Sequence, residues 1–385
     1  MSAATSADVV VVGAGIVGAA CARALAAEGL SVTVVDRGHV AGGTTGAGEG
    51  NILVSDKGPG PELDLALLSR RLWSELGDVL PPEVELEAKG GLVVATSEAA
   101  LAPLLSGAAA QREAGVVADE VAAGDLLEHE PHLADDLPGG VHYPQDMQVQ
   151  PMLAAAHLLR LARESGALVL AGHQVVGIRR SATGAIAAVL TAYGEIPCSA
   201  VVNAAGSWGS EIAAMAGGPI PVMPRRGFVL VTEPLPRVVR QKVYSADYVA
   251  NVASGAEGLE TSAVVEGTAS GPVLIGASRE RVGFDRTMSY EVLGRLAQQA
   301  VRLFPALASV RVQRAYRGFR PYCPDHLPVI GPDPRVPGLF HACGHEGAGV
   351  GLAPATALLI AQSLTGTTLT QSLEPFSPLR FSEAA

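Results

Sequence analysis

The chain has 385 residues, of which 48% are hydrophobic and 17% charged, so it can bury a large core and general disorder is excluded. This length favours two domains or one large composite fold. The net charge of −11, from 27 basic and 38 acidic residues, argues against nucleic acid or an anionic membrane as the main partner.

The first predicted elements are a strand, a glycine-rich turn, a helix and a second strand. A continuous β-branched run predicts a strand buried on both faces over 8–12. A helix is expected over 16–28, and a second buried strand over 31–35. The pattern G-x-G-x-x-G, made by Gly13, Gly15 and Gly18, spans the turn after the first strand and the start of this helix.

This arrangement is typical of proteins that bind a dinucleotide. The first glycine permits a tight turn, the second lets a pyrophosphate approach the helix N-terminus, and the third lets helix and strand pack closely. Asp36 follows the second strand and is expected to accept hydrogen bonds from a ribose without a 2′-phosphate. A glycine turn without a ligand is the alternative, but strand, helix, second strand and acid all agree. These residues do not choose between NAD and FAD.

In the middle of the chain, helices are expected over 62–77 and 290–304, and residues 147–178 predict a helix followed by two strands.

The cysteines have neither CxxC nor zinc-ligand spacing, so no metal site is expected. Reduced, buried thiols of this kind are typical of a cytoplasmic protein. The apolar run near the N-terminus is expected to be a strand and not a signal peptide, and no transmembrane segment is expected.

A second glycine-rich turn is predicted near the C-terminus, over 344–351, between a short strand at 338–343 and an apolar helix at 352–364. No buried strand with a terminal acid follows, so this is not a second dinucleotide site. The turn offers backbone N–H groups at the positive end of a helix, which suits the negative edge of a reduced flavin. A plain strand-to-helix turn is the equal alternative.

Several motifs together resemble those of the D-amino-acid-oxidase-type FAD oxidoreductases, a family that includes glycine oxidase, sarcosine oxidase and amino acid dehydrogenases. They are the dinucleotide pattern, GGTTGAGEGNIL at 42–53, VVNAAGSWGSEIA at 201–213, GFRPYCPDHLPVIG at 318–331 and GHEGAGVGLAPAT at 344–356. The resemblance extends from Val9 to about Gly366. Within the family, residues 48–63 and 261–286 are most similar to the flavin subunits of D-hydroxyproline dehydrogenase and opine oxidase, which commonly work in hetero-oligomers.

The resemblance implies an α/β fold with a Rossmann-like FAD-binding domain of the glutathione-reductase type and a discontinuous, mixed α+β substrate domain. The FAD-binding domain would gather residues 1–56, 148–221 and 319–385, and the substrate domain residues 57–147 and 222–318. Some relatives attach the flavin to a cysteine just before the arginine motif. Here that position is Gly318, and Cys323 lies beyond it, so non-covalent FAD is expected.

The resemblance also implies which residues contact the cofactor. They are Gly13, Ala14, Gly15, Ile16, Val17, Gly18, Asp36, Arg37, Gly43, Thr44, Thr45, Glu49, Gly50, Asn51, Val175, Val176, Ala205, Gly206, Trp208, Arg320, Gly344, His345, Glu346, Gly347, Ala348, Gly349, Val350 and Gly351. Thr44 and Thr45 can donate to the pyrophosphate or form local caps. Val175 and Val176 fall where the backbone pairs with adenine, or they simply pack in the core.

Four residues are candidates for catalysis. Arg320, in the G-x-R-P motif, matches the family arginine that binds the substrate carboxylate, although an ion pair with Asp325 or an interdomain acid is the alternative. Tyr248 would share that carboxylate, or it is a half-buried strand tyrosine. His345 would contact flavin or substrate, or bond to the backbone of its turn. Glu49 would take a proton from a substrate ammonium or contact a partner, although a solvated loop glutamate is commoner.

The implied reaction is oxidation of the C–N bond of an amino or imino acid, such as a proline-like, glycine-like or opine substrate. The Cα hydride would pass to flavin N5, leave an imine, and send electrons to an acceptor or partner subunit. The alternatives are an oxidase that releases H₂O₂, an NAD-dependent dehydrogenase and a non-catalytic flavoprotein subunit. An insertion at 252–271, rich in Gly, Ser, Ala and Glu, is expected to be a lid or a subunit contact.

Overall fold

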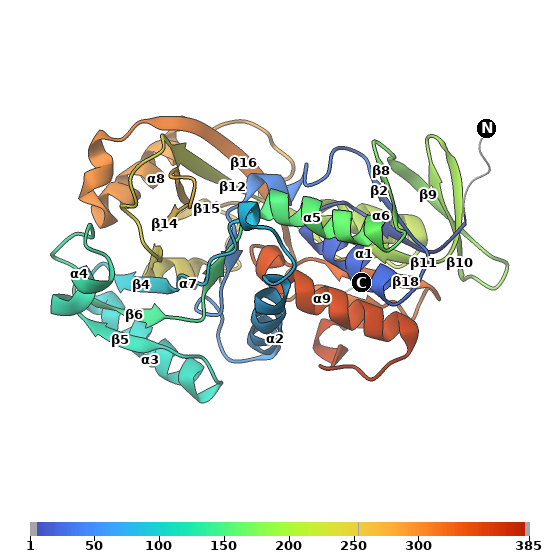
Figure 1. Cartoon of the computed structure of the whole chain (residues 1–385), viewed down its shortest axis with the longest axis horizontal. Coiled ribbons are helices and arrows are strands. Elements are labelled where there is room, and N and C mark those ends of the chain that lie inside the picture. The colour runs from blue at the N-terminus through green and yellow to red at the C-terminus, as the bar shows by residue number, and fades with distance from the viewer. Residues whose placement is uncertain (1–5, 253, 382–385) are drawn as a thin grey trace.

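A computed structural model of the chain describes residues 6–252 and 254–381, and two eight-stranded sheets dominate it (Figure 1). In the first sheet, the strand order is β17-β18-β11-β1-β2-β8, and β10 and β9 extend from β11. Its strands are β1 (Ala7–Val12), β2 (Val32–Asp36), β8 (Leu168–Ala171), β9 (Val175–Arg180), β10 (Ile186–Thr191), β11 (Gly194–Asn203), β17 (Val329–Pro332) and β18 (Leu339–Cys343). From β18 to β8, neighbouring strands are parallel.

The strand, helix and second strand predicted at the N-terminus are β1, α1 (Ile16–Ala27) and β2. The glycines between them are required by space as well as by conformation. Gly13 has a φ of 113°, and a Cβ there would overlap the carbonyl of Ala204. A Cβ on Gly18 would overlap the Gly13 carbonyl, so only glycine lets α1 lie this close to β1.

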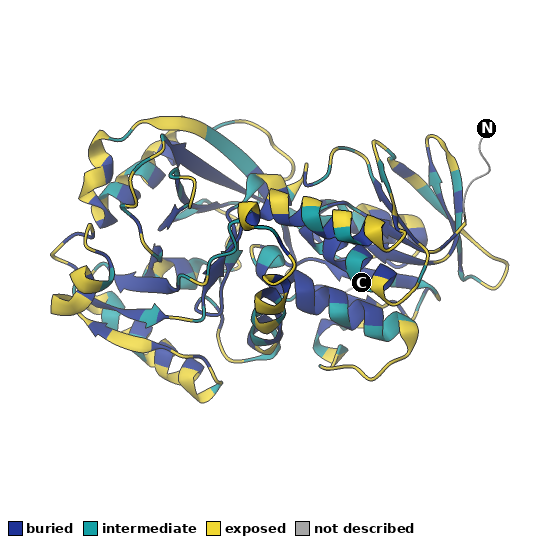
Figure 2. Cartoon of the chain, in the orientation of Figure 1, coloured by how far each residue is buried: buried dark blue, intermediate teal, exposed yellow. Residues whose placement is uncertain are grey.

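Helices cover the first sheet. α1 packs against both α5 (Pro151–Glu164) and α9 (Gly349–Thr365), and α6 (Gly209–Ala216) packs near β9. Figure 2 shows most of α9 buried, whereas α5 presents exposed residues to solvent. α9 begins at Gly349, three residues before the predicted start, because Leu352 N–H already donates to Ala348 O at 2.9 Å.

The second sheet has the order β16-β12-β15-β14-β13-β4-β6-β5 and is antiparallel except for the β13–β4 pair. Its strands are β4 (Gly91–Ala95), β5 (Asp119–Ala122), β6 (Gly139–Tyr143), β12 (Met223–Thr232), β13 (Lys242–Ser245), β14 (Glu260–Gly267), β15 (Val273–Arg279) and β16 (Val312–Tyr322). The amphipathic helix α8 (Tyr290–Leu303) packs on β12, β14 and β15. The other helices of this part are α3 (Glu98–Glu113), α4 (Leu126–His129) and α7 (Ala246–Val252).

The two sheets meet where β16 ends. β16 pairs with β12 along its whole length, and the register places Arg320 opposite Arg225. A short ladder of β3 (Asn51–Ile52) and β7 (Met147–Gln148) lies at the same junction. The strands of the first sheet come only from the ranges expected for FAD binding, but β16 runs to Tyr322, past the expected boundary at 318.

Helix α2 (Pro61–Leu76) lies at this junction in Figure 1 and departs from the expected domain division. Its residues were expected in the substrate domain, yet α2 packs on α9 of the first lobe. Ser69 Oγ donates to Gly351 O at 2.6 Å, and the fully buried Trp73 donates from Nε1 to Val350 O at 3.1 Å. The division at residue 57 therefore does not separate two independent cores.

The segment 252–271 was expected to be a lid or a subunit contact, and of these the lid is wrong for its second half, whereas the subunit contact stays a prediction. That half contains β14, an interior strand between β15 and β13 with a largely buried run from 262 to 267, so it cannot move as a lid. Residue 253 of this segment, like residues 1–5 and 382–385, lies outside the described residues. Within the described ranges, no helix has the length and apolar character needed to cross a membrane.

Candidate active site

A cavity of about 440 Å³ runs from the glycine turn after β1 to the junction of the two sheets. Of the predicted site residues, those that line it are Gly13, Gly15, Ile16, Val17, Asp36, Arg37, Gly43, Thr44, Thr45, Glu49, Asn51, Val175, Ala205, Gly206, Trp208, Tyr248, Arg320, His345, Glu346, Gly347, Gly349 and Val350. Those that do not line it are Ala14, Gly18, Gly50, Val176, Gly344, Ala348 and Gly351. Several of the second group serve close packing, and Val176, 57% exposed, faces solvent.

The end of the cavity at α1 has the features that hold a dinucleotide. The Asp36 carboxylate accepts hydrogen bonds from Ala14 N at 2.8 Å and Gly38 N at 2.7 Å, which fixes it at the cavity wall. Thr45 Oγ1 accepts from Ile16 N at 3.0 Å and keeps its own proton free to donate. The absence of a side chain on Gly15 leaves the N-terminus of α1 open to an anion. A pyrophosphate and a ribose fit these groups.

Two predicted contacts have other partners. Thr44 Oγ1 donates to Phe319 O at 2.6 Å, so its proton is not directed at a pyrophosphate. The Arg37 guanidinium lies 3.8 Å from the centre of the Trp208 ring, and Trp208 stacks on Phe284 with ring centres 4.9 Å apart. Arg37 and Trp208 both line the cavity, so this stack forms part of its wall.

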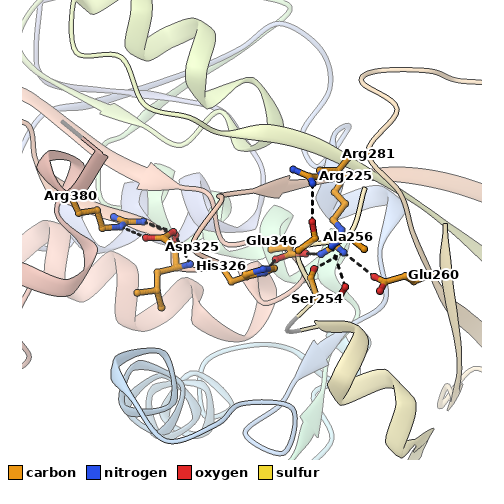
Figure 3. Close-up of polar contacts among 11 residues, drawn as sticks. Arg225, Ser254, Ala256, Glu260, Arg281, Asp325, His326, Glu346 and Arg380 are labelled. Carbon is orange, nitrogen blue, oxygen red and sulfur yellow. Dashed lines mark hydrogen bonds and ion pairs between the residues drawn. The ribbon is translucent and has the colours of Figure 1, made fainter. Parts of the chain in front are cut away.

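Arg320 faces the cavity from the end of β16. Its Nη1 donates to Ser278 O at 2.8 Å, which holds the guanidinium in place. The alternative ion pair with Asp325 is not formed, because Asp325 Oδ2 lies 2.6 Å from Arg380 Nε (Figure 3). Among the described residues, no carboxylate lies within ion-pair distance of Arg320. The site therefore presents a fixed cation that has no carboxylate in ion-pair contact.

Glu346 holds the second glycine turn against β16. Its backbone N–H donates to Pro321 O at 2.9 Å, and its φ of 48° is an uncommon left-handed conformation for glutamate. Its carboxylate contacts Arg225 Nη1 at 2.6 Å and His326 Nδ1 at 3.1 Å (Figure 3). Burial alone would raise the pKa of Glu346, but His326 and Arg225 together lower it, so the carboxylate stays charged and anchored.

His345 is buried in the same turn, with 3% of its surface exposed. Its Nε2 lies 3.0 Å from Thr356 Oγ1, so the bonding to turn backbone considered from the sequence is not what the structure shows. Burial lowers the pKa of His345 to about 3. The imidazole therefore lines the cavity as a neutral group.

Glu49 is not the solvated loop residue that sequence reasoning favoured. It is 9% exposed, lines the cavity and accepts a hydrogen bond from Asn51 Nδ2 at 3.3 Å. Burial raises the pKa of Glu49, although the nearby ammonium of Lys242 opposes the effect. Lys242 is itself buried, pairs with Glu266 at 2.9 Å and donates to Asn51 Oδ1. A buried charge cluster thus adjoins the cavity.

Tyr248 lies on helix α7 and not on a strand, and it is buried. Its ring meets that of Tyr244 edge-on with centres 5.1 Å apart. Burial raises the pKa of Tyr248, so its hydroxyl stays protonated and can donate a hydrogen bond into the cavity.

The four cysteines are buried and form no disulfide. Cys343 lines the cavity, and burial raises its pKa, which keeps the thiol protonated and weakly nucleophilic. Cys323 is fully buried outside the main cavity. Burial raises the pKa of Cys323 as well and outweighs the effect of Arg380 on both residues, so neither thiol is activated for attack on a cofactor.

Sequence reasoning missed three cationic residues at the site, namely Lys242, Arg279 and Arg286. A usable signal was present for Arg279, because a positive charge ends the otherwise uncharged, buried strand VLIGASR. A charge in such a strand is either paired or functional. No comparable signal marked Lys242 or Arg286.

Comparison with known proteins agrees with this fold. The glycine oxidase of Geobacillus kaustophilus is 29% identical over 381 residues, which are 97% of each protein, and its crystal structure has a TM-score of 0.88 over 97% of this chain and 99% of that one. L-proline dehydrogenase from P. horikoshii has a TM-score of 0.88 at 25% identity over 98% of both chains. Hydrogen cyanide synthase subunit HcnC of Pseudomonas aeruginosa is 32% identical over 259 residues, which are 67% of this chain but only 58% of that subunit.

The family model described as DAO, FAD dependent oxidoreductase, matches residues 8–363. The glycine turn, Asp36 and the open N-terminus of α1 supply the contacts that the adenosine diphosphate part of FAD requires. NAD would need the same contacts, so it is the match to this family that identifies the cofactor as FAD, and the chain belongs to the DAO family of FAD-dependent oxidoreductases.

Proposed function

We propose that this enzyme oxidises the C–N bond of a small amino or imino acid. The observation that carries the proposal is Arg320, a guanidinium that faces the cavity without a carboxylate partner in the described part of the chain. A guanidinium binds a carboxylate through two parallel N–H···O bonds and keeps its charge at any physiological pH. The names of two similar proteins, glycine oxidase and L-proline dehydrogenase, support an amino or imino acid as substrate.

The residues of the cavity have separate roles in binding and orienting the substrate. Arg320 holds the carboxylate, and the Tyr248 hydroxyl, which is protonated at neutral pH, donates a further hydrogen bond to it. His345 is neutral and so contributes shape and no charge. Bound FAD supplies the acceptor for the hydride that leaves the substrate Cα, while the nitrogen loses a proton and a C=N bond forms. Fixing the carboxylate fixes which hydrogen is presented, which is the main contribution of the protein.

A partner subunit is the proposed electron acceptor. The support is the similarity to HcnC, which is named as a subunit of hydrogen cyanide synthase. The similarity to glycine oxidase favours a second candidate, an oxidase that reduces O₂. The free, buried cysteines support a reducing compartment such as the cytoplasm. Rapid reoxidation of the lone chain by air would favour the oxidase, whereas slow reoxidation and a larger mass after co-expression with neighbouring reading frames would favour the hetero-oligomer.

The substrate is sought first by an anaerobic screen. Purified yellow protein is mixed with D-hydroxyproline, D-proline, glycine, sarcosine and opines, and loss of flavin absorbance is recorded. Bleaching by any of these supports the proposed function. A flavoprotein that none of them bleaches would instead support the non-catalytic alternative.

Replacing Arg320 tests the carboxylate contact. Arg320→Ala should keep its FAD but lose roughly 30- to 1000-fold in kcat/KM, or about 2–4 kcal/mol, because the substrate loses a desolvated, charge-assisted contact. Arg320→Lys should recover only part, since an ammonium cannot form the fork. Arg314→Ala, an exposed arginine on the same strand, is the matched control and should change little.

A substrate without a carboxylate provides the control that can contradict the proposed Arg320 contact. The matching amine should be a poor substrate of the native enzyme and should lose little more in Arg320→Ala. If the amino acid and the amine lose the same factor, Arg320 has a structural role and the proposed carboxylate contact is wrong.

A further inference from the structure

Arg279, the last residue of β15, is a second arginine beside the site, and only 3% of it is exposed. It lines a small cavity of about 30 Å³ that adjoins the main one, because Arg320, Tyr248 and His345 line both. Arg279 lines only the small cavity, whereas the glycine turn after β1 lines only the main cavity. Arg279 therefore lies beyond Arg320 as seen from the dinucleotide end.

The guanidinium of Arg279 has no anionic partner in residues 6–252 or 254–381, and no hydrogen-bond acceptor for its side chain is found there either. Its guanidinium lies over the face of the Tyr248 ring, 5.1 Å from the ring centre. The neighbouring Arg225 shows what a buried arginine ordinarily requires, because it contacts Glu346 at 2.6 Å and Glu260 at 3.1 Å. Arg279 has neither.

The acidic residues of the small cavity form no ion pair with Arg279. Asp56 pairs with Lys57 at 2.6 Å, and Glu346 is held by its own cations. Burial raises the pKa of Glu62 to about 7, so this carboxyl group is partly protonated at neutral pH. None of the three lies within ion-pair distance of Arg279, and Glu346 acts on it only from farther away. Arg279 and Arg320 thus place two unpaired guanidinium groups at the wall of the small cavity.

An unpaired guanidinium in a buried position is costly, and the like charge of Arg320 increases the cost. A bound anion removes both costs at once. The small cavity has room for about two water-sized groups, which matches the two oxygens of a carboxylate.

We propose that Arg279 binds a second carboxylate of the substrate, so that the enzyme acts on amino- or imino-dicarboxylates. The inference rests on the proposed function, in which Arg320 holds the carboxylate beside the reacting C–N bond. The second carboxylate belongs either to a substituent on the nitrogen or to the side chain, and a guanidinium recognises both in the same way.

Binding of unreactive analogues tests the second site without turnover. Thiodiacetate places its second carboxylate as a nitrogen substituent would, and glutarate places it as a side chain would. Each is compared with its monoamide, which has the same shape and one charge fewer, by calorimetric titration of the native holoenzyme. At least one diacid should bind about 10- to 100-fold more tightly than its monoamide, as expected for a charge-assisted contact. The preferred diacid identifies the position of the second carboxylate.

Variants of Arg279 test whether this residue causes the preference for the diacid. Arg279→Met keeps the length and burial of the side chain and should reduce the diacid preference to within about threefold, while the monoamide binds as before. Arg279→Lys should keep part of the preference. FAD content and Tm report whether each variant folds. Equal binding of diacid and monoamide by the native protein overturns the proposal even if no variant folds. An equal loss for both ligands in Arg279→Met overturns it too, because Arg279 would then share the carboxylate of Arg320.

The binding and bleaching experiments distinguish the absence of a second carboxylate site from an error in the proposed reaction. The analogues contain no amine, so their binding is independent of oxidation. If no amine bleaches the flavin while the diacids still depend on Arg279, the proposed reaction is wrong and the second site stands. If amines are oxidised but diacid and monoamide bind alike, the reaction stands and the second site is wrong.

Discussion

Burial sets the charge of individual residues around the cavity more than their sequence neighbours do. It lowers the pKa of His345 and raises that of Tyr248, so both present neutral groups. It also raises the pKa of Glu49, which sequence reasoning favoured as a solvated loop residue. Arginine is different because its guanidinium keeps its proton in proteins, so Arg320 remains a cation beside the neutral side chains of His345 and Tyr248.

The depressed pKa of His345 predicts acid sensitivity. The unfolded chain takes up this proton near pH 6.5 and the folded chain only near 3, so the contribution to stability is complete above pH 6.5 and is lost as the pH falls. Between pH 7.5 and 5.0 the loss is about 2 kcal/mol. His345→Gln, which can still bond to Thr356, should lack this component. Urea unfolding at pH 7.5 and 5.0 measures the free energy of unfolding of both proteins. If native and variant protein lose the same free energy of unfolding between these pH values, His345 is not the source of the acid sensitivity.

At the scale of elements, close packing of helices on the first sheet positions the cofactor end of the site. α1 approaches β1 because Gly18 has no side chain, and α2 ties down the start of α9 through Ser69 and Trp73. The N-termini of α1 and α9 both reach the cavity, so helix packing and cofactor binding depend on the same contacts.

Two glycine replacements should therefore have opposite effects. Gly18→Ala forces a methyl group into the Gly13 carbonyl, so α1 must shift, which should cost about 1–3 kcal/mol and weaken FAD binding. Gly107→Ala, in the exposed part of α3, meets nothing within 4 Å and should gain about 0.5–1 kcal/mol without affecting FAD. Thermal melts and FAD titration of the apoproteins measure both. Unchanged FAD affinity in Gly18→Ala would show that this packing does not support the site.

At the scale of the whole molecule, the cavity joins the two lobes. Its wall combines the glycine turn of the first sheet with Tyr248 and Arg320 from the second. The largest group of buried apolar residues likewise extends from α1 and α9 into β4 and Tyr244. FAD bound here would contact both lobes, so its binding should stabilise the molecule as a unit.

FAD should be held without a covalent bond, because Cys343 at the cavity is kept as a thiol by burial and Cys323 lies outside the main cavity. Acid precipitation should release a free yellow chromophore. Added FAD should raise Tm, with a stabilisation of about 2.7 kcal/mol when free FAD is 100 times its Kd. Yellow colour that stays with the precipitated protein, or a Tm independent of added FAD, would disprove reversible binding.

The sequence by itself determined the elements whose signals are local. Residues 8–12 and 31–35 are apolar, β-branched runs, and the structure places β1 and β2 within one residue of them. The glycine spacing and Asp36 identified a dinucleotide site for the same reason, because one turn of chain brings these groups together. Arg320 stood out because its motif is short, stiff and contiguous.

Only the tertiary structure decided how distant segments combine. The Asp325 carboxylate pairs with Arg380, 55 residues away, and so leaves Arg320 free, which no local pattern reveals. Tyr248 and Arg279 become neighbours of Arg320 because β15, β16 and α7 converge at one junction. Burial, and with it the charge of Glu49 and His345, depends on what packs around each residue after these long-range pairings form. Local sequence specifies conformation, but the surroundings of a side chain are set by the chain that folds over it.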